Sequence, residues 1–177
     1  THPQPTGNVI CKTGHIRIDG STALQGMINV VITSYEHTCK GSKIDYNVTD
    51  SQTGIQDLRN SSANNNTRVD IAASDVYDNS TRNDLDDHQI AGVIYTLVES
   101  PNVDVPNLST EKLRAVFDGQ AKNWGDVGGS GTLPIVTVGR HSTSGTSTTF
   151  DTTILSGESE QTTYRLSKPS DVINMVR

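Results

Sequence analysis

The sequence contains no run of about 20 apolar residues, which is the length that a helix needs to cross a bilayer. Basic residues are also scarce, with 14 Lys and Arg against 20 Asp and Glu and a net charge of −6. This balance argues against a nucleic-acid-binding surface, which would need clustered basic side chains. With 32% hydrophobic and 5% aromatic residues, the chain is expected to form one or two small α/β units with a modest core. An anion ligand stays compatible with the negative charge, because local dipoles govern a buried site.

Cysteine is nearly absent. Cys11 and Cys39, the only two, flank the first predicted strand–helix unit. They are either joined in a disulfide that pins the N-terminal arm or two unpaired thiols. The first residues show neither the basic nor the apolar part of a signal peptide, as expected of a processed exported domain or of a shortened chain.

Signatures of catalysis and of metal binding are missing too. The residue two before Ser144 is Ser142, so the G-x-S-x-G pattern of a hydrolase nucleophile is absent, and no histidine follows Ser144. The histidines lack ligand spacings such as H-E-x-x-H. They are His2, His15, His37, His88 and His141. We therefore expect neither an enzyme nor a metal site, and no cofactor.

Apolar periodicity predicts alternating strands and helices, hence an α/β fold with largely parallel sheets. Strands are expected at residues 16–18, 44–48, 69–73, 90–98 and 135–138. Helices are expected after Ser21 or Thr22 as N-cap, after Gly54, over 110–118 with Ser109 as cap, from Thr146, and over 170–177. The Pro-flanked stretch 99–105 separates a first lobe, 1–98, from a second lobe, 99–177.

Several of these strands end in small polar turns, and the strand that ends at Arg140 is followed by Ser144, Gly145 and Thr146. Ligands of open α/β sheets sit beyond the carboxyl ends of strands. A strand that enters a helix through such a turn aims N–H groups and hydroxyls at one point, and an arginine adds a planar fork of donors. Each turn can also be a simple helix cap. Together, the turns predict a cleft between two lobes that suits a tetrahedral oxyanion.

Five motifs occur in an order that resembles the phosphate-binding proteins of bacterial ABC phosphate transporters, a branch of the type 2 periplasmic binding proteins. The resemblance runs from about Ile16 to the C-terminus. The motifs are GST at 20–22, SQTG at 51–54, DIAASD at 70–75, NLSTEKLRAVFDGQAKNW at 107–124 and VGRHSTSGT at 138–146.

The resemblance implies two lobes that close on a dehydrated phosphate held by hydrogen bonds without a metal. It implies that Arg140 makes the charged contact and that Asp75 accepts the proton of the phosphate. The remaining contacts would be hydroxyl and N–H donors from Ser21, Thr22, Ser51, Ser144, Gly145 and Thr146.

A carboxylate beside a dianion is repulsive unless a proton lies between them, so Asp75 would select a protonated oxyanion over sulfate. The alternative for Asp75 is a helix N-cap. Alternatives for the protein are a sensing or adhesion module on the same fold and a binder of another oxyanion, such as sulfate or molybdate.

This sequence departs from the family pattern at two places, and each departure leads to an expectation. Some relatives tether the arginine with an acidic residue two positions later, where this chain has Ser142, so Arg140 is either less restrained or tied elsewhere. Relatives also continue past the helix that ends at Arg177, so we expect an incomplete second lobe. The resemblance further implies an extracytoplasmic protein that delivers phosphate to a membrane permease, as a monomer or an exchanged dimer.

Overall fold

A computed structural model describes residues 9–61, 68–78 and 84–177 of the chain. Three parallel strands form the first sheet, in the order β2-β1-β3. These strands are β1 (Gly14–Gly20), β2 (Ser42–Val48) and β3 (Ile71–Ala73). In this sheet Ile18 of β1 is paired with Tyr46 of β2 and with Ile71 of β3. The predicted α/β class with parallel pairing is confirmed.

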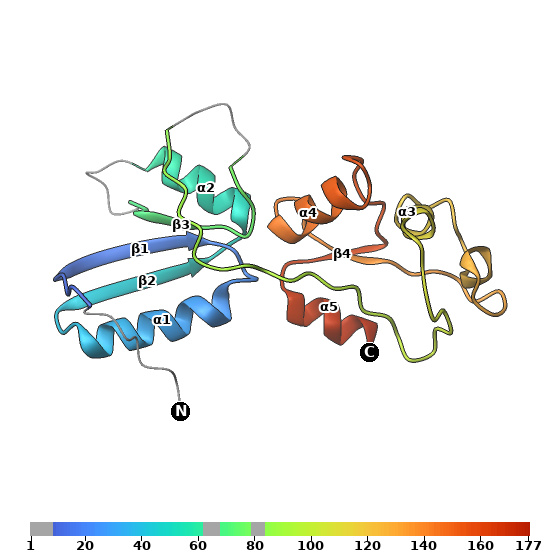
Figure 1. Cartoon of the computed structure of the whole chain (residues 1–177), viewed down its shortest axis with the longest axis horizontal. Helices are drawn as coiled ribbons and strands as arrows, with labels where there is room; N and C mark the ends of the chain where they lie inside the picture. Colours follow the sequence, from blue (N-terminus) through green and yellow to red (C-terminus); the bar gives the residue numbers. More distant parts are fainter. Residues whose placement is uncertain (1–8, 62–67, 79–83) are drawn as a thin grey trace.

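Helices cover both faces of this sheet (Figure 1). Helix α1 (Gln25–Thr38) buries Leu24 and Ile28 against Ala73, and Ile18 and Tyr46 pack around them. The predicted cap of this helix is wrong: its N-cap is Leu24. Neither Ser21 nor Thr22 caps it, because Ser21 Oγ accepts from the backbone N–H of Ala23 and Thr22 Oγ1 accepts from Arg140 Nη2.

Two glycines let β1, β3 and helix α2 (Ser51–Asn60) approach one another at backbone distance. A Cβ on Gly20, which has φ +141°, would lie 2.0 Å from the carbonyl oxygen of Ala73. A Cβ on Gly54 would lie 2.6 Å from the carbonyl oxygen of Asp19. Because only glycine tolerates such approaches, the residues that follow β1 and β3 come close to the first turn of α2.

A second group of elements surrounds a two-stranded parallel sheet, in which Gly139 of β4 is paired with Arg165 of β5. A separate small core of Val116, Ala121 and Val127 packs with Trp124 beside it. The elements are α3 (Thr110–Phe117), the 3₁₀ helix η1 (Trp124–Val127), β4 (Val138–Arg140), α4 (Gly145–Thr153), β5 (Tyr164–Leu166) and α5 (Pro169–Val176).

Two sequence predictions fail in this part of the chain. Residues 90–98, expected as a strand, have no regular structure, and Ile94 is 94% exposed. A strand needs a ladder partner, and none of the described strands pairs with this run. The strand expected over 135–138 lies later, at Val138–Arg140, because its pairing with β5 begins at Val138. Strand β5 itself was not predicted.

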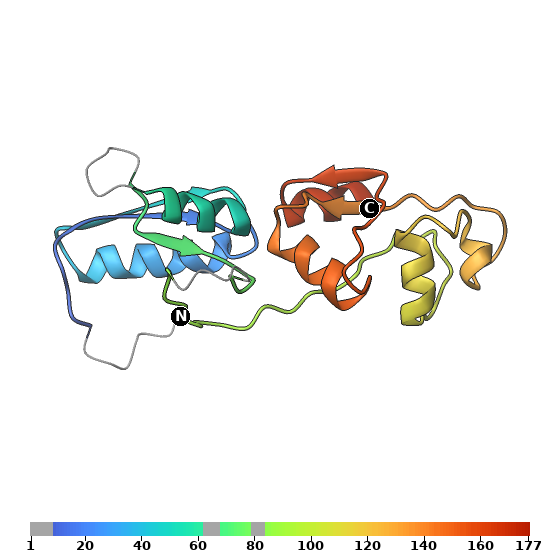
Figure 2. The same cartoon turned by 90° about the horizontal axis from the view of Figure 1, so that it is seen from above.

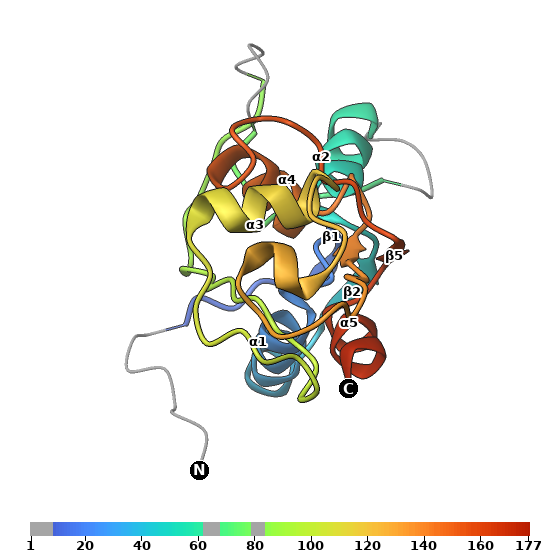
Figure 3. The ribbon, with the colours of Figure 1, turned by 90° about the vertical axis from the view of Figure 1, so that its right-hand side faces the viewer.

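We call β1–β3 with α1 and α2 the N-terminal unit, and the elements from α3 to α5 the C-terminal unit. The two units lie side by side, with α2 and α4 on one side of the sheets and α1 and α5 on the other (Figures 1 and 3). Residues 84–109 connect the units as an extended segment along one side (Figure 2). Among the described residues, no helix combines the length and hydropathy of a membrane span.

A disulfide bond joins Cys11 to Cys39, across a sequence separation of 28 residues. Cys39 is buried at the end of α1, next to the turn that leads into β2. The bond therefore ties the segment before β1 to the helix that follows it.

Replacing both cysteines, Cys11→Ser with Cys39→Ser, should lower the free energy of unfolding by about 2–4 kcal/mol, since the open chain gains conformational entropy when unfolded. Denaturant unfolding of the two proteins measures the difference. A reductant should destabilise the wild type and leave the double variant unchanged. Equal stability of wild type and variant would contradict the prediction.

Candidate anion-binding site between the two units

The carboxylate of Asp75 is the meeting point of hydroxyl groups from four parts of the chain. Its Oδ1 accepts hydrogen bonds from Ser21 Oγ at 2.9 Å and from Ser51 Oγ. Its Oδ2 accepts from Thr146 Oγ1 at 3.4 Å and from Tyr95 Oη at 3.2 Å. Ser21 follows β1 and Ser51 opens α2, whereas Thr146 lies in the first turn of α4, in the other unit. Asp75 thus links the two units through side-chain hydroxyls.

Gly145 of the C-terminal unit lies close against the N-terminal unit. A Cβ at this position would lie 2.3 Å from Asp75 Oδ1 and 2.9 Å from Ser51 Oγ. Gly145 is the first residue of α4, and Ser144, its N-cap, is buried. The N-terminus of α4 therefore faces that of α2, and both present their positive helix ends to the same region.

The guanidinium of Arg140 lies at the end of β4 and is only 6% exposed. Its Nη2 donates to Thr22 Oγ1 at 2.6 Å and to the carbonyl of Ser167 at 2.7 Å. Its Nε donates to the carbonyl of Leu166 at 3.2 Å. Main-chain carbonyls and a hydroxyl therefore hold this side chain, so of the two alternatives for Arg140 it is the one in which the arginine is tied elsewhere.

One nitrogen of this guanidinium differs from the others. Arg140 Nη1 is buried and has no hydrogen-bond partner among the described residues. Burial lowers the pKa of Arg140, although the charges of Asp75, Asp171 and Asp50 act in the opposite direction. A buried, charged N–H donor without an acceptor is costly, so this nitrogen is suited to an anion.

Further polar contacts close the same face. Thr143 Oγ1 donates to Asp50 Oδ2 at 3.0 Å, and Gln52 Nε2 donates to Thr148 Oγ1 at 3.0 Å. Asp50 is the N-cap of α2 and also accepts from the backbone N–H of Thr53. These contacts fix α2 and α4 relative to one another, so both helix N-termini are held at the site.

An ion pair between the buried Glu160 and the more exposed Arg165 supports the strand that carries Arg140. Glu160 is 4% exposed and accepts from Ser147 Oγ and from Arg165 Nη1, both at 2.9 Å. Arg165 Nη1 also donates to the carbonyl of Arg140 at 2.9 Å. Burial raises the pKa of Glu160, and these donors oppose the rise.

The structure brings the predicted site residues together in two clusters. Around Asp75 lie Ser21, Ser51, Gly145 and Thr146. Thr22 contacts Arg140 in the second cluster, and Ser144 is the N-cap of α4, next to Gly145. His2 lies outside the described residues, and in the described part of the chain no three His, Cys, Asp or Glu side chains are grouped as metal ligands.

Two tyrosines were missed by sequence reasoning. Tyr46 Oη donates to the carbonyl of Ser21 at 2.5 Å and so fixes the turn after β1. Its burial, with the charges of Asp19 and Asp75, raises the pKa of Tyr46 to about 12. Tyr95 contacts Asp75 from the segment that connects the units. The strand-like alternation around Tyr46 does not indicate its contact with the carbonyl of Ser21. Tyr95 lies in residues 90–98, for which the sequence wrongly predicts a strand.

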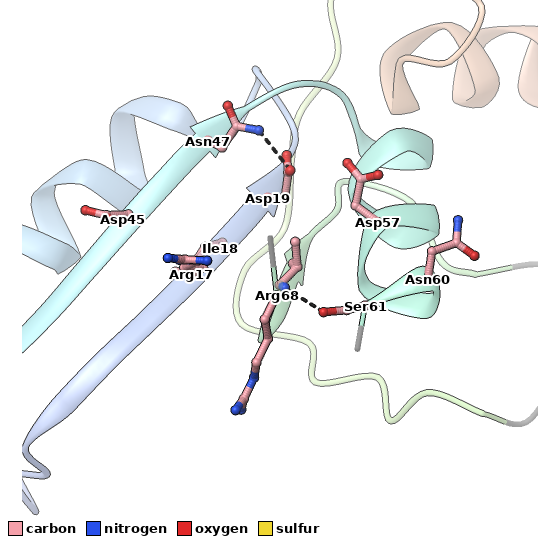
Figure 4. Close-up of a pocket in the computed structure, with 10 residues that line it drawn as sticks. Arg17, Ile18, Asp19, Asp45, Asn47, Asp57, Asn60, Ser61 and Arg68 are labelled. Carbon is pink, nitrogen blue, oxygen red and sulfur yellow. Dashed lines mark hydrogen bonds between the residues drawn. The ribbon is translucent and has the colours of Figure 1, made fainter. Parts of the chain in front are cut away.

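A pocket of about 460 Å³ lies elsewhere, between β1, β2 and the end of α2 (Figure 4). Its buried acid, Asp19, already accepts from Asn47 Nδ2 at 2.9 Å and Thr49 Oγ1 at 2.7 Å. Burial raises the pKa of Asp57 in the same pocket, and the charge of Asp19 adds to the rise. Its acids face one another and no orphaned donor lies there among the described residues, so the site at Asp75 and Arg140 is the stronger anion candidate.

Comparison with known proteins places the chain in a family. Residues 9–176 match the family described as the PBP superfamily domain. The chain belongs to this family. Among curated proteins, it is 28% identical over 142 residues to the phosphate-binding protein PstS of Bacillus subtilis, which covers 78% of this chain and 45% of that protein. It is 24% identical over 114 residues to PstS of Borreliella burgdorferi, covering 64% of this chain and 39% of that one.

Solved structures agree on the fold. An ABC-type phosphate transport receptor from Vibrio cholerae aligns with a TM-score of 0.62 at 23% identity, covering 91% of this chain and 66% of the receptor. A putative phosphate ABC transporter substrate-binding protein with bound phosphate, from Clostridium perfringens, aligns with a TM-score of 0.64 at 16% identity, with coverages of 92% and 66%. The chain thus spans less than half the length of its curated relatives and about two thirds of these structures.

Substituting Gly145→Ala should separate the two units, because the added methyl group would strike the Asp75 carboxylate. We expect a larger radius of gyration in small-angle scattering and a loss of about 1–3 kcal/mol in the free energy of unfolding. Gly26→Ala in α1 is the matched control, since a Cβ there meets nothing within 4 Å. Identical scattering of the Gly145→Ala variant and the wild type would show that the close contact does not hold the units together.

Proposed function

We propose that this protein binds inorganic phosphate between two lobes, residues 1–98 and 99–177, and delivers it to the membrane permease of an ABC transporter. The observation that carries the proposal is Arg140 Nη1, a buried guanidinium nitrogen that has no acceptor among the described residues. The same guanidinium donates to Thr22 Oγ1 of the N-terminal unit, and the charge of Asp75 acts on it. The names of the curated relatives, both phosphate-binding proteins, support the choice of anion.

Each group has a distinct role in this proposal. Arg140 gives the charged hydrogen bond through Nη1, because its Nε and Nη2 already donate to oxygens of the protein. The hydroxyls of Ser21, Ser51 and Thr146, which donate to Asp75 in the structure, turn to phosphate oxygens. Ser144 and Gly145 add donors at the start of α4, and Thr22 adds a hydroxyl from the turn after β1. The ligand replaces hydroxyl–carboxylate bonds with hydroxyl–phosphate bonds, so little hydrogen bonding is lost.

Asp75 gives the site its selectivity. A carboxylate accepts hydrogen bonds only, so a ligand oxygen that faces it must carry a proton. Phosphate keeps one proton near neutral pH, whereas sulfate has none. The site therefore favours phosphate through a hydrogen bond that sulfate cannot make.

Closure follows from the position of the groups. Asp75, Ser21 and Ser51 lie in the N-terminal unit, and Arg140 and Thr146 lie in the C-terminal unit. A ligand that contacts both units favours the arrangement in which they meet. Capture between lobes is a binding function without a chemical step, and no cofactor enters it. The disulfide suits an extracytoplasmic location, where such bonds persist.

Calorimetric titration with phosphate and with sulfate tests the proposal. Phosphate should bind about 100-fold or more tightly than sulfate. Asp75→Asn should lower the affinity for phosphate about tenfold, or about 1.4 kcal/mol. It should also reduce the ratio of phosphate affinity to sulfate affinity, because an amide can donate to an unprotonated oxygen. Asp45→Asn, at an exposed position of β2, is the control and should change neither affinity. Equal affinity of the wild type for the two anions would overturn the role of Asp75.

Arg140→Ala should reduce phosphate affinity by about 2–5 kcal/mol, because it removes one partner of a buried, charged contact. The same titration measures this loss. Arg68→Ala removes an exposed arginine that pairs with Asp70 and should leave the affinity unchanged. A loss of less than tenfold for the Arg140 variant would mean that this side chain does not touch the anion.

A further inference from the structure

Tyr95 reaches the proposed phosphate site from a segment that has no helix or strand. Its neighbours in sequence point outward, and Ile94 is 94% exposed, whereas Tyr95 is 37% exposed. The Tyr95 hydroxyl lies 3.2 Å from Asp75 Oδ2 and 3.0 Å from the Asp75 carbonyl oxygen. A single phenolic O–H is thus shared between the carboxylate and the backbone of one residue.

The four donors to Asp75 divide into two kinds. Ser21, Ser51 and Thr146 sit at strand and helix ends that face the anion site, and the proposed function turns them toward phosphate. Tyr95 comes from outside these ends and belongs to the connection between the units. Once the other three hydroxyls turn to the ligand, Tyr95 is the donor of this set that stays on Asp75.

A carboxylate that accepts a ligand proton must be charged and correctly oriented. Oδ1 is the oxygen shared with Ser21 and Ser51, and Gly145 lies beside it, so Oδ1 faces the ligand position. Oδ2 accepts from Tyr95 at 3.2 Å and from Thr146 at 3.4 Å, and Tyr95 is the one of these two donors that stays when Thr146 turns to the ligand. On the basis of the proposed function, we infer that Tyr95 is a positioning residue, which fixes Asp75 through Oδ2 so that Oδ1 accepts the proton of phosphate.

The state of the phenol fits this role. Burial raises the pKa of Tyr95, and the negative charge of Asp75 raises it further. The hydroxyl therefore stays protonated at neutral pH and can only act toward the carboxylate as a donor.

A double-mutant cycle on phosphate binding tests the inference. Tyr95→Phe keeps the ring and removes the hydroxyl, and it should weaken phosphate binding about three- to tenfold. In an Asp75→Asn background, the same substitution should change the affinity less than twofold, because the carboxylate is already absent. Tyr164→Phe, on the surface of β5, should change the affinity less than twofold in either background. An equal loss from Tyr95→Phe in both backgrounds, or no loss in either, would overturn the role.

A measurement without ligand separates this inference from the proposed function. Tyrosinate absorbance is followed against pH, and the contribution of Tyr95 is the difference from the Tyr95→Phe variant. This ionisation should move to lower pH in Asp75→Asn, since the charge that opposes it has gone. If the ionisation of Tyr95 does not shift in Asp75→Asn, the contact between Tyr95 and Asp75 is disproved. If the shift occurs and the wild type binds no phosphate, the contact exists, and the positioning role falls together with the proposed function.

Discussion

The fold depends at one point on a carboxylate that both halves of the chain share. Asp75 receives hydroxyl groups from the end of β1, from the start of α2, from α4 and from the connecting segment. Close backbone packing at Gly20 and Gly54 sets the first two donors in place, and Gly145 lets the third approach. Without these three glycines the carboxylate would lie outside the reach of its donors. The packing of the sheets and helices therefore brings several short side chains to the two carboxylate oxygens of Asp75.

Opposite charges balance the site. The Asp75 carboxylate takes part in the field that keeps Arg140 charged, and burial of the guanidinium works against it. The backbone of Arg140 is also fixed, because its carbonyl accepts a hydrogen bond from Arg165, which is paired with the buried Glu160. Its own partners are uncharged. The cation is thus oriented without being neutralised by direct contact, and it can interact with an anion.

Local sequence signals predicted most of the fold. Alternation over 44–48 and helical spacing around Ile28 report burial on one face, so β2 and α1 followed from periodicity. Ser109 caps α3 as predicted, because its hydroxyl oxygen accepts from the backbone N–H of Lys112. The predictions failed where pairing with residues far away in the sequence determines the secondary structure. Residues 90–98 have strand composition without a strand to pair with, and β5 owes its existence to its pairing with Val138. For the site, the family motifs gave residue identities, whereas the partners of Tyr46 and Tyr95 depend on tertiary contacts that no spacing encodes.

The exposed run at residues 90–98 has a consequence for the behaviour of this chain in solution. It contains nine consecutive uncharged residues, IAGVIYTLV, and Ile90, Ile94 and Leu97 are 74%, 94% and 49% exposed. Uncharged segments rich in β-branched and aromatic side chains readily add to strands of other molecules. Its backbone offers unpaired donors and acceptors without a charged side chain to keep a second molecule away. Colloidal stability of the isolated chain is therefore limited by this segment, despite the net charge of −6 on the whole molecule.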